Sequence, residues 1–203
     1  MPQAIGAKAQ IIYQAETTFK TDPTTPDAKL LYFVSEDFKF SRNLIDSAVI
    51  RGTRDAARPV LGNYEVAGSI KTELQAYIGT LLLATLGSVT TTGTGPYVHT
   101  IKVGNSLPSL VIEKGFTDIG QYIKFNGCKV NRMSLAVRPE GFQEITFEFM
   151  GAKQTSDTTS FDSTPTDLGK VSFTGFDIAE VTEGGTAIAN ITEVDIAIEN
   201  NLD

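Results

Sequence analysis

The sequence of 203 residues predicts a mainly β fold, an antiparallel β-sandwich or half-barrel with one flanking α-helix at about residues 73–86. Two patterns carry this prediction. Between residues 106 and 151, short apolar-rich runs follow one another, each broken by Gly, Pro, Asn or Asp. In the last two runs apolar and polar residues alternate, which places successive side chains on opposite faces of a pleated sheet. The alternating residues are Met133, Leu135 and Val137, and then Ile145, Phe147 and Phe149.

The turn between these two runs is Pro139-Glu140-Gly141. Proline fixes its φ angle and glycine leaves φ free, as a tight reversal requires. We therefore expect an antiparallel meander with one face on a core and the other open to water or to a partner. Nothing in its pattern indicates a catalytic site.

Four strands are expected before the predicted helix, and a loop follows the first of them. Residues 16–27 contain two prolines and several threonines, which favours a loop. The strands are expected at residues 8–14, 30–34, 38–41 and 64–71.

The stretch 42–63 is expected to be a long loop, because its apolar pattern loosens and Arg, Asp, Gly and Pro interrupt it. Loops longer than about 12–15 residues are usually functional or disordered. Three interpretations stay open: a loop that docks on another copy of the protein, a loop that contacts DNA, and a plain mobile loop. The interleaved acids weigh against DNA. The candidate contact residues are Arg51, Arg54, Asp55 and Arg58.

One helix is predicted, at about residues 73–86. Thr72 and Gln75 have the spacing of a capping box, and apolar residues recur after them at helical spacing. Gly87 stands where a left-handed cap would end the helix. A polar connector over residues 88–96 and a strand over 97–103 follow.

The last quarter of the chain is expected to begin with an exposed linker at 152–167, rich in Ser, Thr and Asp. Two strands follow, at 171–178 and 191–199, joined through Gly184-Gly185. We find no internal repeat, so residues 1–203 are interpreted as one domain. The strongly patterned last strand stands close to Asp203, which leaves open a C-terminus shortened from a longer native protein.

The charge is unevenly distributed along the chain. Residues 1–150 carry 15 Lys and Arg against 14 Asp and Glu, whereas residues 151–203 carry 2 against 10. Proteins that grip nucleic acid use Lys and Arg to displace the counterions of phosphate groups. The acidic excess instead suits a surface past which DNA must move without binding.

The usual catalytic and cofactor-binding patterns are missing from the sequence. A nucleophile–base pair or a zinc site needs more than His99 and Cys128, the only residues of their kinds. The acids of the last quarter could form a calcium site or a glycosidase pair, although a solvated acidic face is the simpler interpretation. We expect no enzyme activity, no cofactor and no metal. The N-terminus lacks a signal pattern and the longest apolar stretch is too short for a membrane helix, which predicts a soluble protein made in a cytoplasm.

Several segments, taken in order, resemble the tail tube proteins of long-tailed bacteriophages and prophages. The resemblance covers roughly residues 60–200, each piece is short, and the ordered set is what makes it specific. The matching segments are residues 66–74 (VAGSIKTEL), 81–89 (LLLATLGSV), 97–100 (YVHT), 107–115 (LPSLVIEKG), 125–131 (FNGCKVN), 139–141 (PEG) and 149–151 (FMG).

The resemblance implies a virion protein that assembles into stacked, hexameric rings, whose inner sheets join into a barrel through which genomic DNA is delivered. Its partners would be other copies of itself and the tape measure, tail terminator and tail tip or baseplate proteins, with no membrane. It would be made in the cytoplasm of the bacterial host. The alternatives are the tube subunit of a contractile secretion or injection system and a non-enzymatic β-sandwich binding module. The candidate lumen-facing acids are Glu144 and Glu148 of one hairpin and Glu193, Asp195 and Glu199 of another, and which of the two hairpins lines the lumen stays open. The 42–63 loop and the first few residues are expected to contact the next ring.

Overall fold

The computed structural model describes residues 3–50, 52, 54–55, 57–178, 180, 182–188 and 192–202. It is built from strands, with α-helix α1 (Gly79–Leu86) and the short 3-10 helices η1 (Gly6–Lys8) and η2 (Gly175–Asp177). The mainly β fold with one flanking helix is therefore confirmed. The strands are β1 (Ala9–Ala15), β2 (Lys29–Leu31), β3 (Ser35–Glu36), β4 (Lys39–Ile45), β5 (Val60–Glu73), β6 (Gly87–Thr92), β7 (Val98–Val103), β8 (Leu110–Phe116), β9 (Gln121–Val137), β10 (Glu144–Gly151), β11 (Lys153–Asp157), β12 (Thr182–Glu183), β13 (Thr186–Ala187) and β14 (Val194–Glu199).

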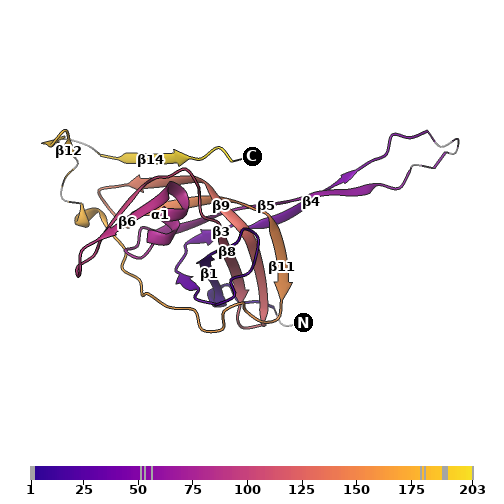
Figure 1. Ribbon diagram of the computed structural model, residues 1–203, viewed down its shortest axis with the longest axis horizontal. Helices are drawn as coiled ribbons and strands as arrows, with labels where there is room; N and C mark the ends of the chain where they lie inside the picture. The colour runs from indigo at the N-terminus through magenta and orange to yellow at the C-terminus, as the bar shows by residue number, and fades with distance from the viewer. Residues whose placement is uncertain are drawn as a thin grey trace.

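Ten of these strands form one curved antiparallel sheet around the core (Figure 1). Its main path runs β2-β1-β8-β9-β10-β5-β3. Strand β9 is the axis of the sheet, because its first part pairs with β8 and β11 and its second part pairs with β10 and β14. The sheet thus folds over itself along one long strand, as in the half-barrel that the sequence predicted.

The alternating residues of the meander point into this core. Ile145, Phe147 and Phe149 of β10 are buried, and so is Met133 of β9. They pack with the buried residues of β1, β5 and β8 and with Ile78 and Leu81 at the helix. Period-two burial on β9 and β10 confirms the predicted meander and its inward face.

Two of the predicted runs of the meander are one strand. Residues 121–137 form β9 without a break, although Asn126-Gly127 reads as a turn in the sequence. Gly127 has a φ of 66°, and the pairing of β8 with β9 shifts its register at the same level. A glycine with positive φ bends a strand and forms a bulge without ending it. The Asn126-Gly127 break between apolar runs is therefore a kink within a continuous strand.

The helix is shorter than predicted. It begins after Ile78 and ends at Leu86, so the start expected at residue 73 is wrong. Thr72 and Gln75 do not form a capping box: the Gln75 side chain donates to the Thr72 hydroxyl and to the Tyr32 carbonyl, both of which lie before the helix. Gly87 does have the left-handed conformation expected of a C-cap, with φ 94°.

Two polar segments that were predicted as connectors are structured, and one predicted strand is not formed. Residues 88–96 were expected to be a flexible connector, but they hold most of β6, which pairs with β7 in a separate hairpin. Residues 152–167 were expected to be an exposed linker, but β11 pairs with β9, and Asp162 is buried. In 171–178 only isolated bridges and η2 occur where a strand was expected.

The stretch 42–63 is a hairpin arm rather than a loop over its whole length. Strands β4 and β5 stay paired out to Ile45 and Val60, so the connecting segment is confined to residues 46–59. The arm projects far from the body along the longest axis of the molecule (Figure 1). The sequence missed these strands because it was searched for apolar residues that alternate with polar ones. Both faces of this ribbon are exposed, so its backbone pairing does not require that alternation.

We expect a large loss of stability when the buried side chain of Phe147 is truncated. Phe147 is fully buried and central in β10, so Phe147→Ala should lower the free energy of unfolding by roughly 3–5 kcal/mol. Chemical denaturation of the unassembled subunit measures this. The control is Thr146→Ala on the opposite face of the same strand, which should cost less than about 1 kcal/mol. Equal losses in the two variants would contradict the assigned orientation of β10.

Candidate functional site: the charged face and the projecting arm

The second half of β9, with β10, β14 and β5, forms a four-stranded layer that has one face on the core and one face open. We call the open face the charged face. In the paired registers, Glu148 of β10 and Glu199 of β14 both lie opposite Arg132 of β9. Glu144 and Asp195 both lie opposite Ala136, and Glu144 also lies opposite Glu73 of β5. Residues from the two hairpins of the chain therefore meet on one surface.

All five acids that the sequence singled out belong to this surface, and all five are in ion pairs. Arg132 pairs with Glu148 at 4.0 Å and with Glu199 at 3.6 Å. Arg138 pairs with Glu193 at 2.5 Å and with Asp195 at 3.0 Å, and Lys71 pairs with Glu144 at 2.7 Å. Five carboxylates thus share three cations, which leaves an excess of −2 on these groups.

The cations of this face were only partly visible in the sequence. Alternation with Met133, Leu135 and Val137 puts Arg132 and Arg138 on the polar face of their strand. Nothing in the sequence connects Lys71 to the acids. The signal for Arg132 was present: counting across the Pro139-Glu140-Gly141 turn brings it level with Glu148. The hydrogen bond from Arg138 lowers the pKa of Asp195 below its ordinary value, so this carboxylate stays charged.

Short side chains separate the charges of the charged face. Ser134 and Ala136 of β9, Thr146 of β10 and Ser69 of β5 occupy the positions between the ion pairs. A surface of short polar groups and internally paired charges offers no deep pocket and few free cations to a phosphate chain. It is suited to contact without strong binding.

The arm carries exposed apolar residues on both of its faces. Leu44 pairs with Leu61 and the next pair is Ile45 with Val60, so the two pairs point to opposite sides of the ribbon. All seven residues of β4 are exposed. Nearer the body, Arg42 lies 5.0 Å from the ring centre of Tyr64 and donates to the Gly62 carbonyl at 2.7 Å. A two-stranded ribbon of this kind is marginally stable alone in water.

The candidate contact residues of the sequence lie near the tip of this arm. Arg54, Asp55 and Arg58 are exposed there. Arg51 lies outside the described residues, so its position is not assigned. Within the part of the chain that the structure describes, Arg54 and Arg58 form no ion pair.

Open strand edges flank the charged face. β14 pairs with β9 and with no other strand among the described residues. On the far side of the layer, β5 is bordered by the two-residue strand β3 and then by β4 of the arm. Unpaired N–H and C=O groups along such edges are templates for strands of another chain.

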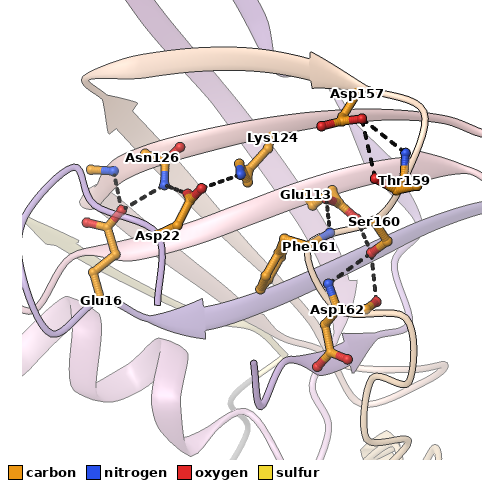
Figure 2. A network of polar contacts seen from close by, with 11 residues as sticks. Glu16, Asp22, Glu113, Lys124, Asn126, Asp157, Thr159, Ser160, Phe161 and Asp162 are labelled. Atoms are coloured by element: carbon orange, nitrogen blue, oxygen red, sulfur yellow. Dashed lines mark hydrogen bonds and ion pairs between the residues drawn. The ribbon is translucent and has the colours of Figure 1, made fainter. Parts of the chain in front are cut away.

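A polar network fastens the N-terminal loop to the kink of β9 (Figure 2). Glu16 accepts hydrogen bonds from the Gly127 amide at 2.8 Å and from the Ser109 hydroxyl at 2.7 Å. Asp22 accepts from Lys124 at 2.6 Å and from Asn126 at 2.8 Å. Burial acts to raise the pKa of Asp22, but the bonds from Lys124 and Asn126 outweigh it and hold this pKa below its ordinary value.

The same network continues to the segment after β11, where the carboxylate of Glu113 is buried (Figure 2). Glu113 accepts hydrogen bonds from the Ser160 hydroxyl at 2.5 Å and from the Phe161 amide at 3.0 Å. Burial raises the pKa of Glu113, although both hydrogen bonds act in the opposite direction. The segment that resembled a free linker is therefore tied to the sheet by a buried acid.

The remaining candidates for chemistry are dispersed. His99 lies in the β6–β7 hairpin against the Thr91 hydroxyl, and Cys128 is buried in the core, where burial raises its pKa. Among the described residues no group of three or more His, Cys, Asp and Glu side chains is arranged to hold a metal ion. Across the same part of the chain, every helix is too short or too polar to cross a membrane.

The family model described as "Phage tail tube protein" matches residues 6–203. The chain belongs to the phage tail tube protein family. The match extends well before residue 60, where the resemblance in the sequence was weak, and it includes the whole arm. A search of the curated proteins found no match.

Solved structures resemble this chain to different degrees. The tail tube of SPP1, from solid-state NMR and cryo-EM, aligns with a TM-score of 0.53 at 10% identity over 79% of this chain and 82% of that chain. The sheath–tube complex of an extracellular contractile injection system aligns with a TM-score of 0.46 at 9% identity, over 73% of this chain and 88% of that one. A type six secretion system protein aligns at 0.35 and 11% identity, over 72% and 82%. The first of these places this tail tube protein in the same fold as the SPP1 tube.

The buried acid predicts a pH dependence of stability. Because the pKa of Glu113 is raised in the folded state above its ordinary value of 4.5, the folded state binds the proton more tightly. The stability from this group is present below the ordinary value and is lost as the pH rises through the raised one. In Glu113→Gln, which cannot titrate, this loss of stability as the pH rises above the ordinary value should disappear.

The measurement is the difference in free energy of unfolding between wild type and variant at each pH. Glu140→Gln is the matched control, because Glu140 is exposed in a turn and its removal should leave the pH profile unchanged. Parallel profiles for wild type and Glu113→Gln would contradict the prediction.

Proposed function

We propose that this tail tube protein assembles into hexameric rings that stack into the hollow tube of a phage tail, through which the genome is delivered. The family match over residues 6–203 carries this proposal. The outer strands of the sheet support it, because β14 on one side and β3 and β4 on the other pair with no further strand among the described residues and can pair with neighbouring copies. A ring closes such edges by a contact between two different surfaces.

In this ring the charged face lines the bore. The other face of the layer is occupied by the core, with α1 and the remaining strands packed behind it. When neighbouring layers join edge to edge into a closed barrel, the covered face must lie outside, so the charged face lies inside. Glu144, Glu148, Glu193, Asp195 and Glu199 then face the DNA.

The paired charges suit this role. The acidic excess repels phosphate, while Arg132, Arg138 and Lys71 are held by carboxylates and are less available to bind it. A wall of uniform negative charge would also repel itself across the ring, and the internal ion pairs limit that repulsion. The wall therefore opposes binding of DNA without a large electrostatic cost to assembly.

The arm provides the contact with the next ring in this proposal. It projects beyond the body and ends in exposed apolar and basic residues, including Arg54 and Arg58. The tube would join the tape measure, tail terminator and tail tip or baseplate proteins in the virion tail, after synthesis in the host cytoplasm. A structural role without enzyme activity agrees with the family.

Electron microscopy of the concentrated protein tests the assembly. We expect rings or stacked tubes roughly 100 Å wide, given six bodies of ordinary compactness around a channel. A species that stays monomeric at every concentration, also with the tail tip proteins added as an initiator, would refute the proposal.

Thiol labelling of assembled tubes tests the orientation of the charged face. Thr146→Cys places a thiol in the middle of this face, and the native Cys128 is buried and gives a low background. A bulky maleimide should label the variant quickly as a free subunit and slowly in long tubes, because it reaches the bore only through the ends. Equal labelling rates in both states would place this face on the outside.

A further inference from the structure

We infer that the arm of one subunit docks on a specific surface of a second copy, formed by the 139–142 turn, residues 174–178 and Glu180. We call this surface the turn patch. The inference rests on the proposed ring assembly and names the contact that its arm makes. It is carried by the shape, the exposed apolar residues and the opposite charges of the two surfaces.

The turn patch is a rigid platform. The helix η2 rests on the turn, since the Gly175 amide donates to the Gly141 carbonyl at 3.1 Å and Thr174 bridges to Phe142. A Cβ at Gly175 would lie 1.9 Å from the Pro139 carbonyl oxygen, so nothing larger than glycine fits in this contact. Asp177 closes η2 in a capping box with Thr174. The backbone that presents the surface is thus fixed before any partner arrives.

Large apolar side chains are exposed on this platform, although the Lys170 ammonium lies 5.3 Å from the ring centre of Phe142 and covers part of it. Phe176 is 92% exposed and Phe142 is 52% exposed. At the arm, Ile50 is 96% exposed, and Val49, Leu44 and Ile45 are more than half exposed. Exposed aromatic groups on rigid backbone mark contact surfaces. Each surface therefore has apolar area that the other could cover.

The charges of the two surfaces are complementary. Residues 42–63 contain four Arg and two Asp, whereas residues 171–203 contain seven Asp and Glu and neither Lys nor Arg. Around the turn patch Glu140, Asp177 and Glu180 are exposed. Opposite charge at the rim of an apolar contact steers association and excludes like-charged surfaces. The arm is therefore matched to this end of a second copy and mismatched to another arm.

The two surfaces lie at opposite ends of the molecule. The arm extends to one end of the longest axis, and the segment with η2 and β12 lies at the other (Figure 1). The arm of a subunit thus cannot reach the turn patch of the same subunit. A contact between different surfaces at opposite ends repeats from copy to copy and builds a closed ring or an open stack. The second copy is therefore the occupant that the geometry supports.

Charge reversal tests the contact. Arg54→Glu with Arg58→Glu makes the arm acidic, and Glu140→Lys with Glu180→Lys makes the turn patch basic. We expect each pair of substitutions alone to reduce assembly at least tenfold, measured by sedimentation. A mixture of the two proteins should assemble again, since every arm then meets a patch of opposite charge. Asp177 is left unchanged because it caps η2.

Cross-linking gives a second measurement that does not require tubes. Ile50→Cys and Phe176→Cys, made in separate proteins and mixed under mild oxidation by oxidised glutathione, should form a disulfide-linked heterodimer. Thr91→Cys in the β6–β7 hairpin replaces Phe176→Cys in the control and should give little. Tubes of wild type with no heterodimer and no rescue in the charge-reversed mixture would overturn this contact while leaving the tube function intact. Absence of any assembly together with a heterodimer would refute the tube function and retain the contact.

Discussion

Strand β9 belongs to two regions of the sheet, and its kink at Gly127 decides where the neighbouring strands lie. Before the kink it pairs with β8 and β11, and after it with β10 and β14. The bend must be held, because a glycine with positive φ is also a flexible point. Glu16 restrains the bend by accepting a hydrogen bond from the Gly127 amide, and Asp22 accepts one from the side chain of the neighbouring Asn126. The N-terminal loop therefore stabilises the bend between the two halves of β9.

The acids of this chain have two different roles that the sequence does not distinguish. Glu16 and Glu113 are internal acceptors that fasten loops to strands, and their hydrogen bonds to backbone amides repay part of their loss of water. The acids of the charged face stay in water and share three cations. The net charge of the chain does not distinguish the internal acids from the acids of the open surface. The partners of each carboxylate show which acids hold loops to strands and which stay on the open surface of the sheet.

The sequence was sufficient for the fold class, the inward face of the meander and the end of the helix at Gly87, because these follow from local periodicity and backbone conformation. It was insufficient where pairing is non-local. The arm, the β6 strand and β11 have polar or irregular patterns, and their partners lie in other parts of the chain. It identified the acids of the charged face but not their meeting on one surface, since that depends on β14 returning beside β9.

Several features that look unfavourable in a lone subunit all favour association with another chain. The unpaired edge of β14, the apolar ribbon of the arm and the bare ring of Phe176 each invite association, and unspecific association would mean aggregation. Unspecific association is restricted because each feature binds only a surface unlike itself. A strand edge needs a partner strand in register, and a basic arm is repelled by another basic arm. Self-complementary patches would stop at a dimer, whereas these surfaces leave a new edge and a new arm after every addition. An architecture that exposes them at opposite ends is therefore one that can grow by repetition.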